Sequence, residues 1–370
     1  MADNSSVNNT VSDATGKSMS WWKILLPVLI GLSVVAWLFW RDARSQDLGA
    51  ELRAISFTPY VVGCIALAWL FMIGRDFGLS WRFRALTDRQ LSWKQAIKVN
   101  CLCEFTSCIT PSAVGGSSLG MVFLNREGIE LGRATTLMLT TLFLDEFFFV
   151  VSCPIVVLIT PAGELFNSGG TTFQAGLQLT FWIVYACITA WTALLFFGII
   201  LWPKGISSLI KRLFRLRWLN RWQQQANDLA ANMVATAAAL RSKPKRFWLE
   251  TFGGTALSWT SRYLVVNALF LAFVPQADPE QWLILARQFV VWVVLMVSPT
   301  PGGSGLSEWL FTEFYGSLIP TAALALIMAI FWRIISYYVY LIIGAVLVPR
   351  WLRDSFSRSR KSSGKQAVKS

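Results

Sequence analysis

The sequence predicts an all-α polytopic membrane protein. Of its 370 residues, 55% are hydrophobic and 14% are charged, which is too apolar a balance for one soluble core of this length. Apolar segments near the length of about 20 residues that a bilayer-spanning helix needs recur along the chain. Lysine and arginine concentrate between these segments. This pattern is typical of membrane topology, so we expect no nucleic-acid partner despite the net charge of +13.

Six apolar segments are predicted to span the membrane in full. In chain order they are 24–40, 60–74, 134–159, 177–201, 247–274 and 321–348. Residues 1–23 are polar and are expected to form a disordered N-terminal tail, and residues 349–370 are expected to form a basic C-terminal tail. The transmembrane domain is therefore predicted to cover residues 24–348.

Two further apolar stretches, 96–124 and 283–315, are interrupted by proline and glycine. No arm of either stretch is long enough to cross a bilayer alone. Each stretch is therefore predicted to be a re-entrant helical hairpin, and the alternative is a pair of ordinary kinks or loops. The residues at the two interruptions are Thr110, Pro111, Gly115, Gly116, Thr300, Pro301, Gly302 and Gly303.

The distribution of basic residues predicts the orientation. Lysine and arginine are dense in three segments, which are 75–98, 204–246 and 350–369. Segments 160–176 and 275–282 contain neither residue. Because basic loops stay in the cytoplasm, both termini are expected there, in a bacterial cytoplasmic (inner) membrane. Arg126 and Arg133 then require the first hairpin to enter from the cytoplasm, whereas the second enters from outside.

The elements repeat in opposite orientation. Residues 60–159 and 247–348 each contain a span, a hairpin and a span, so the two units form an inverted repeat. Interrupted segments at corresponding positions of two halves are typical of a transport site near the bilayer midplane. The connection at 203–246 carries leucines near helical spacing among basic residues. It is predicted to be an amphipathic helix on the cytoplasmic surface.

Ionisable side chains at bilayer depth are costly and are candidate site residues. Asp145 and Arg333 follow the two interruptions by similar distances, so they occupy corresponding positions of the two units. An ion pair between Arg333 and either Asp145 or Glu146 would compensate both charges, and its role could be structural or substrate binding. Arg262 is the candidate for binding a phosphate. The other ionisable residues at this depth are Glu104, Arg287 and Glu308.

The hairpin tips complete the predicted site. A helix that restarts after either glycine pair presents unpaired backbone N–H groups and a positive dipole end, which suit an anionic headgroup. The chain contains no histidine, which removes imidazole chemistry, and we expect no catalytic residue, metal or cofactor. The predicted substrate-binding residues are Thr110, Gly115, Gly116, Asp145, Glu146, Arg262, Thr300, Gly302, Gly303, Glu308 and Arg333.

Two stretches of the second half, 298–308 and 331–344, resemble the transmembrane, flippase-like domain of the lysylphosphatidylglycerol synthases. They carry Pro301-Gly302-Gly303, Glu308, Arg333 and Gly344. Stretches 109–116 and 125–134 of the first half are similar as well, and the resemblance extends over about 24–353. Family members often carry an arginine where this chain has Thr140-Thr141-Leu142-Phe143. The aminoacyltransferase domain of the bifunctional members is expected to be absent.

The resemblance implies a transporter that moves a polar-headed lipid between leaflets. The headgroup would be anionic, glycosylated or aminoacylated, and we expect no enzymatic activity. The alternative is an integral membrane accessory subunit or an enzyme of lipid or cell-envelope polysaccharide biosynthesis, with buried carboxyl groups as its acids and bases. The expected partners are membrane lipids, together with a second copy of the chain or a lipid-synthesis enzyme. Substrate, direction and coupling ion stay open.

Overall fold

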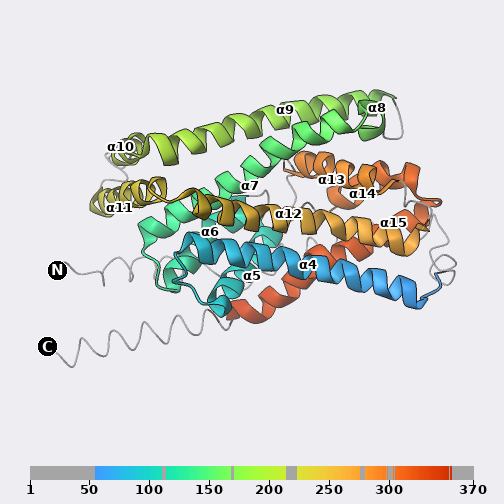
Figure 1. Cartoon of the computed structure of the whole chain (residues 1–370), viewed down its shortest axis with the longest axis horizontal. Coiled ribbons are helices and arrows are strands. Elements are labelled where there is room, and N and C mark those ends of the chain that lie inside the picture. The colour runs from blue at the N-terminus through green and yellow to red at the C-terminus, as the bar shows by residue number, and fades with distance from the viewer. Residues whose placement is uncertain are drawn as a thin grey trace.

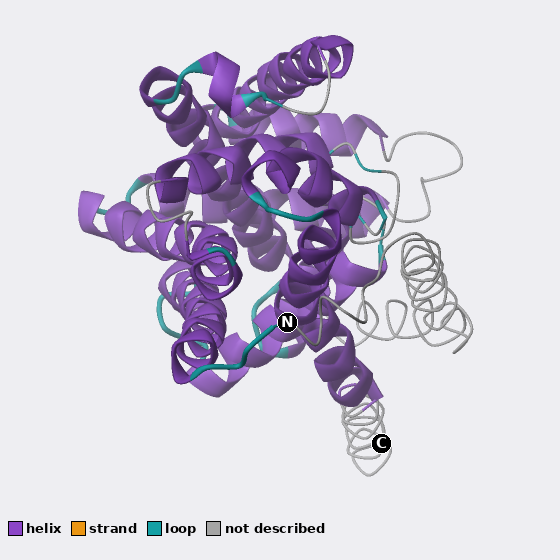
Figure 2. Ribbon diagram, turned by 90° about the vertical axis from the view of Figure 1, so that its right-hand side faces the viewer, coloured by secondary structure: helices purple, strands orange, loops and turns teal. Residues whose placement is uncertain are grey.

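The computed structural model describes residues 55–110, 114–167, 171–213, 223–275, 280–296 and 305–349, together with Ser298, Gly303 and Trp351. The predicted first span, the N-terminal tail and nearly all of the C-terminal tail lie outside these residues. Within the described ranges, helix is the only regular secondary structure. Figure 2, a view along the long axis of Figure 1, shows the helices end-on as one bundle.

Five helices in the described part of the chain are long and apolar enough to cross a bilayer. They are α4 (Pro59–Leu86), α7 (Leu131–Ile159), α9 (Thr171–Leu195), α12 (Lys245–Phe273) and α15 (Ala322–Arg333), which continues through a π-helical turn, η5 (Ile334–Tyr338), to Pro349. The all-helical membrane class is confirmed, and the five helices overlap five of the six predicted spans.

Helix α4 is longer than predicted. The sequence prediction ended this span at Gly74 and assigned Arg75 and Arg82 to a cytoplasmic loop, but the helix continues to Leu86 and buries both arginines. Thr58 caps its N-terminus by accepting a hydrogen bond from the N–H of Val61. The prediction was wrong because it treated charge as a mark of the aqueous phase, whereas the partly buried carboxylates of Glu104 and Asp145 partner these two arginines.

Helices α4 and α12 make the most extensive contact in the bundle and lie side by side in opposite directions (Figure 1). Glycines at the crossing explain how close they come. A Cβ atom built on Gly78 would lie 2.6 Å from the carbonyl oxygen of Gly254, and one built on Gly254 would lie 2.8 Å from that of Gly78. Small residues let helix backbones approach in this way inside membranes.

Two pairs of shorter helices occupy the positions of the predicted hairpin arms. Helix α5 (Trp93–Ile109) packs against α6 (Val114–Arg126), and α13 (Gln281–Leu295) packs against α14 (Leu306–Tyr315). Figure 1 shows the two pairs toward opposite ends of the bundle.

The helix restarts differ in detail from the prediction. Gly115 and Gly116 lie in the first turn of α6 and not before it. Helix α14 begins after Gly305, and Gly303 and Gly305 have positive φ angles of 69° and 84°, which glycine adopts without strain.

The connection at 203–246 is not a single surface helix. It contains α10 (Pro203–Leu213), which follows a π-helical turn, η1 (Phe196–Leu201), and α11 (Gln223–Arg241). Helix α11 packs against α7, where a Cβ atom on Gly132 would overlap the side chain of Asn232. At the opposite end of the bundle the short helix α8 (Ala162–Leu165) follows α7 (Figure 1).

Candidate functional site

A cavity of about 230 Å³ lies inside the bundle. Side chains from α4, α5, α7, α12, α13, α14 and α15 line it, so both predicted repeat units contribute. It is several times larger than the volume of about 30 Å³ that one water molecule occupies in the liquid. Its charged lining residues are Arg82, Glu104, Asp145, Glu146, Arg262 and Arg333.

Asp145 is held by α4 and α12. The Nη2 atom of Arg82 lies 3.1 Å from Oδ2 of Asp145, and Nη1 contacts Oδ1, which makes the pair bidentate. The indole N–H of Trp259 donates to the same carboxylate at 2.9 Å. Arg82 also donates to the hydroxyl of Thr255 at 3.1 Å. The carboxylate is thus fixed between three helices.

Arg333 pairs with Glu308 and not with Asp145 or Glu146. Its Nε atom lies 2.8 Å from Oε1 of Glu308, and both side chains are 7% exposed. The guanidinium also lies 3.8 Å from the ring centre of Tyr337. The predicted pairing across the two repeat units is therefore wrong. Corresponding positions in the two predicted units did not place these side chains on facing sides of their helices.

Glu308 also caps its own helix. Its Oε2 atom accepts hydrogen bonds from the backbone N–H of Gly305 at 2.8 Å and from the hydroxyl of Ser307 at 2.9 Å. The negative charge therefore occupies the positive end of α14. The N-terminus of α14 is not the open anion site that the sequence predicts at this tip.

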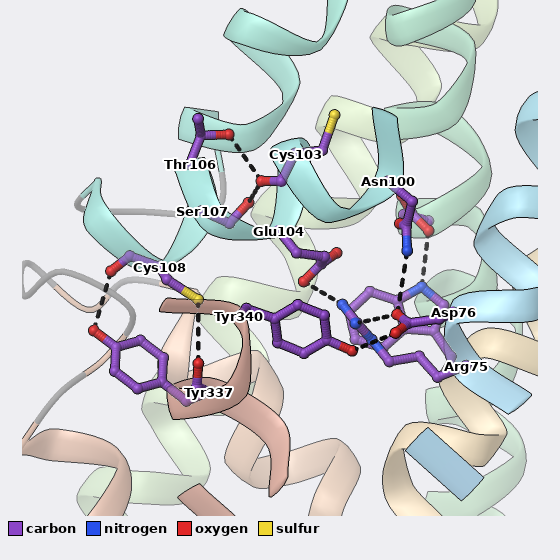
Figure 3. A network of polar contacts seen from close by, with 12 residues as sticks. Arg75, Asp76, Asn100, Cys103, Glu104, Thr106, Ser107, Cys108, Tyr337 and Tyr340 are labelled. Atoms are coloured by element: carbon purple, nitrogen blue, oxygen red, sulfur yellow. Dashed lines mark hydrogen bonds and ion pairs between the residues drawn. The ribbon is translucent and has the colours of Figure 1, made fainter. Parts of the chain in front are cut away.

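A third polar cluster joins α4, α5 and α15 (Figure 3). Arg75 donates to Asp76 at 2.9 Å and forms an ion pair with Glu104. The hydroxyl of Tyr340 donates to Asp76 at 2.7 Å, and the amide of Asn100 donates to it at 3.2 Å. This cluster fixes α5 against both neighbouring helices.

The same figure shows a second link between α5 and the π-helical turn after Arg333. The hydroxyl of Tyr337 donates to the carbonyl oxygen of Cys108 at 3.1 Å. Single π-helical turns inside α-helices are frequent at functional sites, and this one places Ser336 and Tyr337 on the cavity wall.

Arg262 differs from the other arginines of the cavity. Its guanidinium carbon lies 4.5 Å from the ring centre of Trp292 and 5.4 Å from that of Trp259. Neither a hydrogen bond nor an ion pair of Arg262 occurs among the described residues. Stacking on aromatic rings orients a guanidinium while its N–H groups stay available. Among the arginines that line the cavity, Arg262 is therefore the one whose side chain can bind an anion.

The remaining predicted site residues differ in where they lie. Glu146 and Gly303 line the cavity. Thr110 ends α5, where its hydroxyl donates to the carbonyl oxygen of Thr106 at 2.6 Å, and it is not a lining residue. Gly115 and Gly116 belong to α6 as described above. Thr300 and Gly302 lie outside the described residues.

Arg287 has a structural position. It donates to the backbone carbonyl oxygens of Glu164 and Phe314 and to the hydroxyl of Ser317. It thereby ties α8 and the end of α14 to α13, away from the cavity.

Sequence reasoning missed Arg75, Asp76 and Arg82 as parts of the site. Arg75 and Arg82 are seven residues apart, which places them on one face of a helix. No proline interrupts the chain between Gly74 and Leu86. These two observations together could have extended the span and found both arginines.

Comparison with known proteins identifies the family of the chain. The family model of the lysylphosphatidylglycerol synthase TM region matches residues 24–344. The chain belongs to this family. It is also similar to a UPF0104 membrane protein of Archaeoglobus fulgidus, with 22% identity over 331 residues, which cover 88% of this chain and 95% of that protein. No solved structure matches the chain.

The family resemblance rests on residues that contact one another. As a member of the lysylphosphatidylglycerol synthase TM family, the chain is a multi-pass membrane protein. Of the residues that carry the resemblance, Glu308 and Arg333 form a buried ion pair. Gly344 packs against Phe105 of α5, where a Cβ atom would overlap the ring.

Proposed function

We propose that the protein moves a lipid with an anionic headgroup between the leaflets of a membrane. The observation that carries this proposal is Arg262, which lies against the rings of Trp259 and Trp292 in the wall of a cavity and forms no hydrogen bond or ion pair with a carboxylate among the described residues. Arginine with free N–H groups in a desolvated site binds phosphate strongly. Membership of a family named for a lipid synthase supports a lipid ligand.

The remaining arginines of the cavity favour Arg262 as the contact. Arg82 and Arg333 are each engaged by a carboxylate, which is the partly buried Asp145 for Arg82 and the buried Glu308 for Arg333. Their charges are therefore largely neutralised where they stand. A phosphate that enters the cavity would find the N–H groups of Arg262 available, and the two indoles would supply an apolar wall for the adjoining part of the headgroup.

The route follows from the broken helices. We propose that α5 and α6 form a hairpin entering from the cytoplasm and that α13 and α14 form its inverted counterpart from outside. Ser107 and Cys108 near the end of α5 line the same cavity as Gly303 and Ser307. Tips that enter from opposite faces would converge in this way. The headgroup would cross through the cavity while the acyl chains stay in the bilayer, with no covalent chemistry.

The setting of this transporter is also proposed. We place it in the bacterial cytoplasmic membrane with both termini in the cytoplasm, because Arg89, Lys94 and Lys98 still follow the end of α4 at Leu86. Its partners would be membrane lipids, and a second copy or a lipid-synthesis enzyme could supply the substrate.

Reconstitution tests the function. The protein is placed in liposomes with NBD-phosphatidylglycerol, and the rate at which the headgroup changes leaflet is measured by dithionite quenching. Arg262→Gln should lower the rate roughly 10-fold or more, because a hydrogen bond to a charged group contributes about 1.5–3 kcal/mol. Arg241→Gln, at an exposed position near the end of α11, is the matched control. Equal rates for a folded Arg262→Gln and the native protein would count against the proposal.

A further inference from the structure

Glu146 is a buried carboxyl group of the cavity that has no counter-ion. The residue is 9% exposed and lines the cavity wall. Its Oε2 atom is fully buried without a hydrogen-bond partner, and no hydrogen bond or ion pair to either oxygen occurs within the described ranges. Asp145 and Glu308, by contrast, are engaged by Arg82 and Arg333. A carboxylate buried without a partner takes up a proton or a cation.

The charged residues around Glu146 do not compensate a negative charge on its carboxyl group. Asp145 adds a negative charge at the neighbouring position of α7, and Glu104 of α5 is engaged by Arg75. The other titratable lining residues are Cys103, Cys108, Arg262 and Tyr337. The remaining charged residues on helices that pack against α7 do not line the cavity, and they are Arg126, Asp228, Arg241, Lys245, Arg246, Glu250 and Arg287.

We propose that Glu146 is a proton-binding site that couples headgroup movement to proton movement. The inference rests on the proposed function. A phosphate bound to Arg262 would share one cavity with Glu146, because both side chains line it. The added negative charge disfavours an ionised Glu146, which then takes a proton from water that enters with the headgroup. Proton and headgroup therefore each raise the affinity for the other by the same factor.

Calorimetry on the purified protein measures this coupling directly. Dioctanoyl-phosphatidylglycerol is titrated in two buffers of different ionisation enthalpy, and the difference gives the number of protons taken up on binding. Its phosphodiester keeps one negative charge through the neutral range, so the uptake reports on the protein. Binding to the native chain should take up close to one proton, and its affinity should rise up to about tenfold for each unit that pH falls.

Variants assign the proton to a residue. Glu146→Gln should bind with no proton uptake and with an affinity that does not change with pH. Glu164→Gln replaces an exposed carboxyl group of α8 and should behave as the native chain does. In liposomes, an imposed pH gradient should accelerate NBD-phosphatidylglycerol movement by the native protein and by Glu164→Gln but not by Glu146→Gln.

The outcomes separate this inference from the proposed function. Binding by the native protein without proton uptake overturns the inference and leaves lipid transport standing. Equal proton uptake by Glu146→Gln, or affinity that rises with Na⁺ in place of protons, also overturns it. Absence of binding overturns the proposed function and the inference with it. If Glu146→Gln does not fold, the number of protons that the native protein takes up on binding lipid tests the inference instead.

Discussion

The buried pair of Arg333 and Glu308 gives a quantitative test of the charge arrangement. Glu308→Gln removes the charge that lies 2.8 Å from Nε of Arg333, while the amide oxygen can still accept from Gly305 and Ser307. Both side chains are 7% exposed, so water cannot replace the lost partner. Removing one member of a buried pair costs about 3–5 kcal/mol. We expect Glu308→Gln and Arg333→Leu each to lower the free energy of unfolding by an amount in this range.

The double variant separates pairing from other losses. Arg333→Leu with Glu308→Gln should cost less than the sum of the single changes, with a coupling of about 0.5–3 kcal/mol. Unfolding by SDS in bicelles, followed by tryptophan fluorescence, measures the free energies. A second cycle on Arg82 and Asp145 should give comparable coupling, and a cross-cycle on Arg333 and Asp145 should give less. Strict additivity for Arg333 and Glu308, or stronger coupling in the cross-cycle, would refute the pairing.

Three further predictions concern packing and topology. Gly254→Leu should lower the free energy of unfolding by at least about 1–3 kcal/mol, because its Cβ atom would meet the backbone of α4. Gly253→Leu is the control, since no atom lies within 4 Å of its added Cβ atom, and it should change the free energy of unfolding little in the same bicelle assay. Tyr340→Phe should cost about 1 kcal/mol by removing the hydrogen bond to Asp76, and a thermal melt that is unchanged would contradict the cluster in Figure 3. Glu130→Cys, in a chain whose six native cysteines are replaced, should react with an impermeant maleimide from the cytoplasmic side; labelling from outside would exclude the first re-entrant hairpin.

The long apolar helices and the two interrupted stretches were predictable from the sequence. Hydropathy and the positions of Pro111 and Pro301 predicted the long helices and the two interruptions, because each apolar run reports how much of the bilayer it can cross. Asp145, Arg262 and Arg333, which the sequence predicted as site residues, all line the cavity.

Partners were not predictable, because depth does not fix which side of a helix a residue occupies. Arg333 meets Glu308 through the way α14 packs on α15. Asp145 meets Arg82 because α4 extends beyond Gly74 and α4 and α12 approach at Gly78 and Gly254. Such contacts between side chains depend on how helices far apart in the sequence pack together, which no local sequence pattern predicts.

The central claim is that Arg262 receives the phosphate of a lipid headgroup. A structure of the protein in nanodiscs of phosphatidylglycerol tests it most directly. The account predicts a phosphate within hydrogen-bond distance of the Arg262 guanidinium, with the glycerol headgroup against Trp259 and Trp292. Ordered lipid whose phosphate lies elsewhere, with Arg262 contacting protein groups alone, would contradict it.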